Sequence, residues 1–202
     1  MLDKEIHECC KKLRLSQNLA VMAQTTEGET HQEYLFRLLK SELDYRERSR
    51  MAKNIKSAGF YSIKTFDTFR FDEVTLPTDT SPEKLRSLEF MGDKKNIIMY
   101  GKTGTGKTML STAIGVEACK KGYRVKFYRT ASLVNQLSEA KNAGKLGDFL
   151  RKMNKSDLII LDEWEYIPYD RTGAQLLFDF LSEIHEQKPV ILNTNLEFSQ
   201  CH

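Results

Sequence analysis

Gly101-Lys102-Thr103-Gly104-Thr105-Gly106-Lys107-Thr108 stands at the middle of the 202-residue chain. It matches the pattern GxxxxGK[ST] at every fixed position, and this pattern is typical of a loop that wraps the phosphates of a nucleotide. A short apolar run at residues 97–100, which predicts a buried strand, comes directly before it, and a helical pattern over residues 107–120 follows. Because strand, loop and helix in this order are the context that the motif requires, we interpret residues 101–108 as a phosphate-binding loop rather than as an ordinary glycine-rich turn.

The residues of this loop suit a nucleoside triphosphate bound with Mg²⁺. Glycines let the backbone turn so that consecutive N–H groups point at phosphate oxygens, and the start of the following helix adds a partial positive charge. Lys107 is predicted to reach the β- and γ-phosphates, and Thr108 to offer its hydroxyl to Mg²⁺. We therefore predict ATP and Mg²⁺ as cofactors, with the nucleotide bound by residues 101–108 and Met109.

A second polar site follows the apolar run at residues 158–161, which ends in Asp162 and Glu163. Carboxylates at the carboxyl end of a buried parallel strand face the ligand crevice. We predict that Asp162 helps Thr108 to hold Mg²⁺, and that Glu163 polarises the attacking water. Taken alone, the run is also compatible with a strand followed by an acidic turn, but the phosphate loop upstream favours the functional interpretation.

A third polar element follows the apolar run at residues 190–192. Asn195 is our candidate for a group that orients the attacking water, with Asn193 or Thr194 as substitutes. The alternative is an asparagine-rich turn at the end of a strand. With Lys107 and Glu163, Asn195 completes the predicted catalytic set.

The pattern of apolar residues along the chain predicts an α/β fold with a helical N-terminal segment. Residues 1–62 carry two helical patterns separated by a break at residues 25–28, and the longer one runs from about residue 30 to 59. An aromatic, irregular linker follows, and Ser81 before Pro82 predicts a helix start. Over residues 63–202, four apolar runs, at 97–100, 123–128, 158–161 and 190–192, alternate with helical patterns. This alternation predicts a parallel sheet with helices on both faces, the P-loop ATPase core.

Composition excludes several classes of protein. No run approaches 18 apolar residues, so we expect no membrane span, and the charged N-terminus is unlike a secretory signal. The four cysteines form no CxxC pair and the four histidines lack ligand spacing, so we expect free thiols, a cytoplasmic location and no transition-metal site.

Basic residues gather in three places, although the net charge is only +3. Residues 37–56 hold seven basic and three acidic residues, and residues 141–155 hold five basic and one acidic. A third group consists of Lys120, Lys121, Arg124, Lys126 and Arg129. Such clusters can neutralise DNA phosphates without reading sequence. The alternative is that they are solvated helix faces.

Taken together, these residues resemble the IstB-like ATP-binding helper proteins of insertion-sequence transposons, which are close to the DnaC helicase loaders within the AAA+ ATPases. The resemblance covers nearly the whole chain. It rests on residues 11–15, 43–58, 66–69, 115–125, 166–178 and 195–199. The segment 166–178 is far more specific than the nucleotide motifs.

The resemblance implies ATP binding at subunit interfaces, assembly into ATP-dependent oligomers on DNA, and engagement of a transposase. It places the family's phosphate-loop, Walker B and sensor roles on Lys107, Thr108, Asp162, Glu163 and Asn195. Phe66 and Phe69 are candidates for the adenine pocket, or are ordinary packing aromatics.

The chain departs from the family's pattern in two places. Residues 184–188 lack the arginines that usually flank a tyrosine there. The family's arginine finger and last strand would lie beyond residue 202. In the family's strand order, 5-1-4-3-2, the strand at residues 97–100 would then form an edge. We accordingly expect lower stability unless a partner strand covers that edge, and weak or absent hydrolysis of bound ATP.

The leading prediction is an AAA+ ATPase that assists insertion-sequence transposition. A helicase loader of the DnaC kind would share the nucleotide site and differ in its partner. A non-catalytic adaptor that binds nucleotide and DNA is a third possibility. A small-molecule kinase is disfavoured, because an additional strand lies between the two nucleotide motifs and Glu163 follows Asp162.

Overall fold

The structure is a computed structural model that describes residues 2–164 and 171–196. The chain divides into two compact units, Met1–Lys53 and Asn54–His202. The functional boundary that we predict at residues 62/63 stays a prediction. None of the described helices is both long enough and apolar enough to cross a bilayer.

The first unit is built from three helices rather than the two that the sequence predicts. These are α1 (Leu2–Lys12), α2 (Gln17–Thr25) and the first part of α3 (His31–Ala58). The expectation of one helix before residue 25 is wrong because Arg14 adopts a left-handed backbone, with φ of 55°. A residue in this conformation ends a helix.

Glu42 of α3 fixes the turn between α1 and α2. Its carboxylate is 4% exposed and accepts hydrogen bonds from the Ser16 backbone N–H at 2.9 Å and from Arg46 Nε at 2.6 Å. Burial alone would raise the pKa of Glu42, but the bonds from Ser16 and Arg46 hold that pKa below its ordinary value. The ionised form therefore stabilises this turn.

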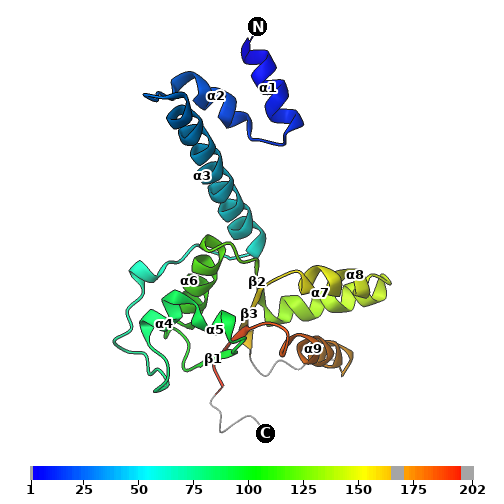
Figure 1. Ribbon diagram of the computed structural model, residues 1–202. Helices are drawn as coiled ribbons and strands as arrows, with labels where there is room; N and C mark the ends of the chain where they lie inside the picture. The colour runs from blue at the N-terminus through cyan, green and yellow to red at the C-terminus, as the bar shows by residue number, and fades with distance from the viewer. Residues whose placement is uncertain (1, 165–170, 197–202) are drawn as a thin grey trace. The chain divides into compact units, whose positions relative to one another are not determined.

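The second unit contains the predicted parallel sheet (Figure 1). Its strands are β1 (Ile97–Tyr100), β2 (Val125–Arg129), β3 (Leu158–Trp164) and β4 (Val190–Thr194). They lie in the order β1-β4-β3-β2, and every pair is parallel. The order of these four strands is thus the one that the resemblance implied.

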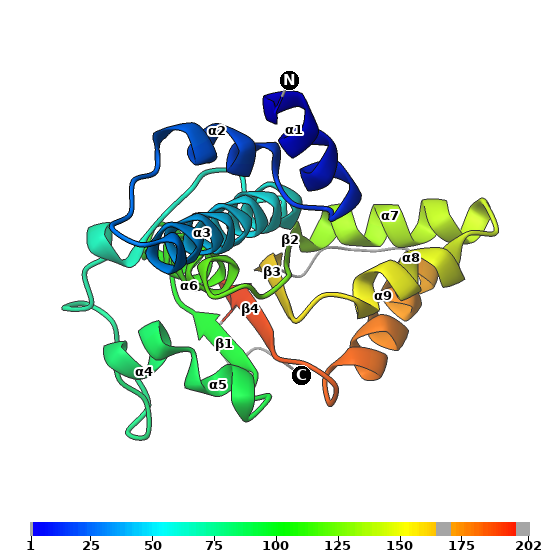
Figure 2. The same cartoon turned by 45° about the horizontal axis from the view of Figure 1, so that its top comes forward.

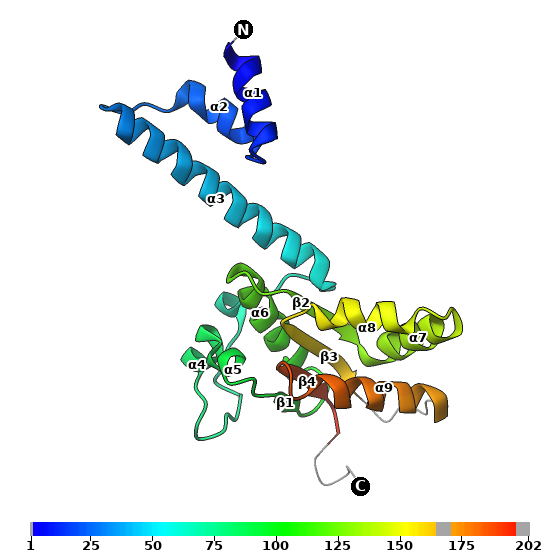
Figure 3. The same cartoon turned by 45° about the vertical axis from the view of Figure 1, so that its right-hand side comes forward.

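Helices cover both faces of this sheet, as predicted (Figures 2 and 3). The helices of this unit that follow β1 are α6 (Lys107–Lys120), α7 (Thr130–Asn142), α8 (Leu146–Asn154) and α9 (Arg171–Ile184). Side chains alternate along a strand, so β3 sends Leu158 and Ile160 into the core beneath α6, and Ile159 and Leu161 into the core beneath α7 and α9. Both faces of this part of β3 are therefore buried.

The segment before β1 is mostly irregular, as predicted. It contains the short helices η1 (Phe66–Thr68), α4 (Pro82–Ser87) and α5 (Glu89–Gly92). Ser81 is the predicted cap, since its hydroxyl accepts a hydrogen bond from the Lys84 backbone N–H at 3.3 Å. This confirms the helix start at Pro82.

Two expectations about the second unit are wrong. Residues 97–100 are not a buried strand, because β1 exposes 51% of Ile98 and 58% of Tyr100. Within residues 2–164 and 171–196, β1 pairs with β4 alone and forms an edge of the sheet. Residues 141–155 are predicted only as a basic cluster, yet they contain the helix α8, which buries Met153.

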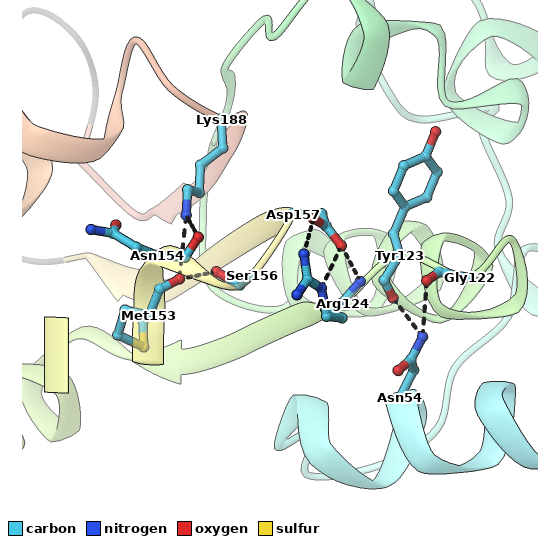
Figure 4. Close-up of polar contacts among 9 residues, drawn as sticks. All are labelled: Asn54, Gly122, Tyr123, Arg124, Met153, Asn154, Ser156, Asp157 and Lys188. Atoms are coloured by element: carbon cyan, nitrogen blue, oxygen red, sulfur yellow. Dashed lines mark hydrogen bonds and ion pairs between the residues drawn. The ribbon is translucent and has the colours of Figure 1, made fainter. Parts of the chain in front are cut away.

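Charges organise the amino end of the sheet (Figure 4). Asp157, just before β3, accepts bonds from the backbone N–H of Arg124 at 2.8 Å and from its guanidinium at 3.1 and 2.9 Å. Lys188, 6% exposed, donates to the carbonyl oxygens of Met153 at 3.3 Å and Asn154 at 2.9 Å. A cation at these last carbonyls of α8 complements the helix dipole. This end therefore holds α8 and the strands in place, away from the phosphate loop.

Candidate nucleotide-binding site

The phosphate loop joins the end of β1 to the start of α6, as predicted. Gly106 is the residue before α6 and has a φ of 87°. Residues other than glycine rarely adopt this backbone conformation. A Cβ at Gly106 would also lie 3.1 Å from Cε2 of Phe69. Glycine is therefore required here by both backbone conformation and space.

Lys107 folds back over the loop. Its Nζ donates to the carbonyl oxygens of Gly101 at 2.6 Å and Lys102 at 2.9 Å. The ammonium group thus lies inside the curve of the loop, where a phosphate would bind. This position suits the predicted contact with the β- and γ-phosphates.

Asp162 is the centre of the polar site. It lies near the end of β3, is 3% exposed, and both carboxylate oxygens lie 3.0 Å from the Thr108 hydroxyl. The Asn193 amide nitrogen donates to Asp162 Oδ1 at 2.8 Å, and the Thr130 hydroxyl donates to the Asp162 backbone carbonyl at 2.9 Å. The structure thus brings Thr108 and Asp162 together, as predicted.

These donors and acceptors fit a magnesium ion. Across residues 2–164 and 171–196, Asp162 forms no ion pair with a lysine, arginine or histidine. An unpaired carboxylate is costly to bury. Asn193 Oδ1 is also buried without a hydrogen-bond partner in this part of the chain. Since Mg²⁺ prefers carboxylate, hydroxyl and water oxygens, Thr108 and Asp162 are the residues that would hold it.

Glu163 follows Asp162 but points elsewhere. Its backbone is left-handed, with φ of 57°, and the pairing of β3 with β4 is irregular between Leu161 and Trp164. Its carboxylate is half-exposed and lies 3.2 Å from Arg129 Nε. The Arg129 guanidinium also lies over the Tyr61 ring, 4.4 Å from its centroid. Sequence reasoning missed Arg129 as a partner of Glu163.

Asn193, rather than Asn195, contacts Asp162. Asn193 belongs to β4 and is 1% exposed, and its amide nitrogen also donates to Ser111 Oγ at 2.7 Å. Asn195 comes after the last residue of β4 and is half-buried. Its role in orienting water stays a prediction.

A cavity of about 690 Å³ opens beside the phosphate loop. It is lined by Phe69, Leu76, Leu85, Tyr100, Lys107 and Leu110, among others. Phe66 does not line it; that ring is 6% exposed, belongs to the core and stacks on Phe71. Of the two aromatic residues proposed for the adenine pocket, the structure places only Phe69 at this cavity.

The model of the IstB-like ATP binding protein family matches residues 9–202. The chain belongs to the IstB-like family. A putative ATP-binding protein of insertion sequence IS5376 from Geobacillus stearothermophilus is 34% identical and aligns with 98% of this chain and 81% of its own length. The corresponding IS21 protein of Pseudomonas aeruginosa is 31% identical, over 84% of this chain and 64% of its own length.

Solved structures of AAA+ proteins share the fold of this IstB-like chain. The DnaC helicase loader superposes with a TM-score of 0.51 at 22% identity, covering 67% of this chain and 78% of its own. Domain III of DnaA from Thermotoga maritima gives a TM-score of 0.51 at 23% identity, covering 60% and 55%. The fold class, a P-loop AAA+ core preceded by helices, is confirmed.

Proposed function

We propose that this IstB-like protein binds ATP with Mg²⁺, hydrolyses it, and assists the transposition of an insertion sequence on DNA. The observation that carries the proposal is the buried contact between Thr108 and Asp162 beside a loop that Lys107 closes. The printed names of the relatives, ATP-binding proteins of insertion sequences, supply the biological setting.

The residues divide the chemistry between them. The loop N–H groups and Lys107 bind the phosphates, and Thr108 and Asp162 hold the ion. Mg²⁺, when bound, neutralises charge on the phosphate oxygens. Glu163 accepts a proton from the attacking water, which requires its carboxylate to leave the Arg129 guanidinium at 3.2 Å. Because both side chains of that pair are half-exposed, the pair is weak and its separation costs little.

The cavity beside the phosphate loop is a suitable pocket for the nucleotide base. Its wall combines the Phe69 ring with apolar side chains such as Leu85 and Leu110. Phe69 packs edge-on against Phe71, with centroids 4.9 Å apart, so its orientation is fixed by the core. We assign the adenine ring to this cavity, next to Phe69.

The helices α7 and α8 and their ends offer an exposed basic surface for DNA. Lys141, Lys145, Arg151, Lys152 and Lys155 are all exposed. Among the described residues, Asp148 is the one carboxylate that pairs with any of them, through Arg151. In the third basic group, by contrast, Arg124 and Arg129 pair with Asp157 and Glu163. The cluster at 141–155 therefore retains most of its charge for phosphates.

The two partner hypotheses separate in a binding experiment. We propose a transposase as the protein partner, because the relatives come from insertion sequences; the runner-up is a replicative helicase. Pull-down of each candidate by the full chain, with and without ATP, decides between them. Size measurement with and without ATP tests the proposed self-association.

The central test is nucleotide binding and turnover. Titration of a fluorescent ATP analogue should show saturable binding by the wild-type chain, and Lys107→Ala should weaken it at least tenfold. Phosphate release, measured with and without DNA, tests hydrolysis. A wild-type chain that binds no ATP would overturn the proposal.

A further inference from the structure

We propose that Asn193 is a positioning residue that holds the metal-binding carboxylate of Asp162, rather than a group that orients the attacking water. The proposal rests on the proposed function, because it concerns the same site. In the catalytic set predicted from the sequence, Asn193 is only a substitute for Asn195.

The hydrogen bonds of Asn193 identify its role. Its amide nitrogen donates to Asp162 Oδ1 at 2.8 Å and to Ser111 Oγ at 2.7 Å. A carboxylate only accepts hydrogen bonds, so the nitrogen of the amide must face Asp162. An amide nitrogen has two protons, and both are used here. Asn193 therefore has no donor left for a water or a phosphate oxygen.

These bonds determine what the Asp162 carboxylate can do. The Thr108 hydroxyl lies 3.0 Å from both carboxylate oxygens but has a single proton. Asn193 donates to Oδ1. Among the described residues, Oδ2 therefore has no side-chain donor other than the Thr108 hydroxyl, and its remaining lone pairs are available. Oδ2 is thus the oxygen that is best prepared to bind a cation.

Ser111 links this arrangement to the helix that carries Thr108. Ser111 lies on α6, and its hydroxyl donates to the Thr108 carbonyl oxygen at 3.2 Å. Asn193 on β4 thereby ties α6 to Asp162 on β3. All three side chains are almost fully buried: Ser111 is 0% exposed, Asn193 1% and Asp162 3%. Hydrogen bonds to a carboxylate are strong in such surroundings, so the two expected metal ligands are held at a fixed separation.

The unpartnered oxygen of Asn193 also favours a functional role. Its Oδ1 is buried and has no hydrogen-bond partner in the described part of the chain. A buried acceptor of this kind is rare in folded proteins and needs a reason. An apolar side chain would avoid this cost, but it could not hold Asp162.

The test compares nucleotide binding at varied Mg²⁺ with nucleotide binding in EDTA, using a fluorescent ATP analogue and the full chain. Loss of a residue that orients a metal ligand typically weakens metal affinity about 10–100-fold. In Asn193→Leu, the Mg²⁺ concentration for half-maximal enhancement of binding should rise about tenfold or more. The affinity for the analogue in EDTA should stay within about twofold, because the side-chain hydrogen bonds of Asn193 among the described residues go to Ser111 and Asp162 and not to the phosphate loop. Ser111→Ala, which leaves the bond to Asp162, should give a smaller shift.

A second variant guards against misfolding. Asn193→Ser leaves room for water and is too short to bridge Ser111 and Asp162, so it should shift the Mg²⁺ dependence in the same direction. Circular dichroism and thermal unfolding without nucleotide check that each variant folds. Equal losses with Mg²⁺ and in EDTA, or no shift in the Mg²⁺ dependence of a folded variant, would overturn the role of Asn193 alone. A wild-type chain that binds no nucleotide would instead overturn the proposed function.

Discussion

Neighbouring side chains at the carboxyl ends of β3 and β4 lie in different surroundings. Asp162 is buried and bonded to Thr108 and Asn193, whereas Glu163, one residue later, is half-exposed and ion-paired with Arg129. Successive side chains of a strand point to opposite faces of the sheet, so the second carboxylate lies away from the first, and Glu163 itself has a left-handed backbone. This separation agrees with the proposed division of roles, in which Asp162 would hold the metal and Glu163 would accept a proton.

Replacement of Glu163 tests this division. Glu163→Gln cannot accept a proton, so phosphate release should fall about 10²–10⁴-fold, while binding of ATP should stay unchanged because Lys107 and Asp162 are intact. Glu139→Gln, an exposed change on α7, serves as the control. Turnover of Glu163→Gln at the wild-type rate would show that another group accepts the proton.

Gly106 offers a test of the loop's backbone. Gly106→Ala places a Cβ 3.1 Å from the Phe69 ring at a φ of 87°, so we expect about 1–2 kcal/mol of destabilisation and weaker ATP binding. Gly147→Ala is the matched control, since its Cβ would meet only Arg151 at 3.9 Å on helix α8. Denaturant unfolding of both variants checks this, and equal effects would contradict the strain argument.

At the scale of elements, charged side chains help to hold the amino end of the sheet, next to the buried apolar residues with which β2, β3 and β4 begin. Asp157 joins the start of β3 to Arg124 before β2, and Lys188 joins the start of β4 to the end of α8. Burial alone would raise the pKa of Asp157, but Arg124 and then Lys188 hold that pKa below its ordinary value of 3.8. Its ionised form is thus stabilised in the folded chain.

This lowered pKa predicts a dependence of stability on pH. The contribution of Asp157 is complete above pH 3.8 and is lost as the pH falls through the lower pKa of the folded chain. Asp157→Asn should lower the free energy of unfolding by about 1–3 kcal/mol at pH 7, and this deficit should shrink in acid. Denaturant unfolding at pH 7 and pH 3 measures it. Asp148→Asn, which removes an exposed pair with Arg151, should change stability by less than about 1 kcal/mol.

The elements show which features the sequence could predict. The bounds of β1 and α6 follow from apolar runs and from the phosphate-loop motif, whereas the order of the strands comes from the resemblance to the IstB-like family. The end of β4 does not, because the apolar run stops at residue 192 while the strand continues to Thr194. Without that end, the sequence could not show that Asn193 faces Asp162. The turn of Glu163 toward Arg129 was equally hidden, since it depends on an irregularity between two strands.

The helix α8 was missed for a different reason. Leu146, Phe149, Leu150 and Met153 recur at helical spacing and contribute to the core beneath α7 and α9. The lysines and arginines between these residues obscure this apolar spacing, because they make residues 141–155 typical of a charged surface. The same segment is therefore both a structural helix and a charged surface.

For the whole molecule, the distribution of charge matters more than its total. A net charge of +3 would give little attraction to DNA if it were spread evenly. Ion pairs with Glu117, Asp157 and Glu163 use three of the five residues of the third basic group, whereas the exposed residues at 141–155 lose only Arg151 to a pair, with Asp148, among the described residues. DNA binding should therefore depend on where basic residues are removed, and not only on how many.

A paired charge reversal tests this dependence. Lys145→Glu with Lys152→Glu should weaken binding of duplex DNA at least tenfold at 50 mM salt, and should make the slope of log K against log salt shallower by up to about 2. Lys64→Glu with Arg70→Glu changes the net charge equally at exposed positions outside the three basic groups, and should have a smaller effect. Fluorescence anisotropy with labelled DNA, from 50 to 200 mM salt, measures both. If the two double variants weaken binding equally, total charge rather than the α7–α8 surface governs the attraction, because only a localised contact distinguishes them.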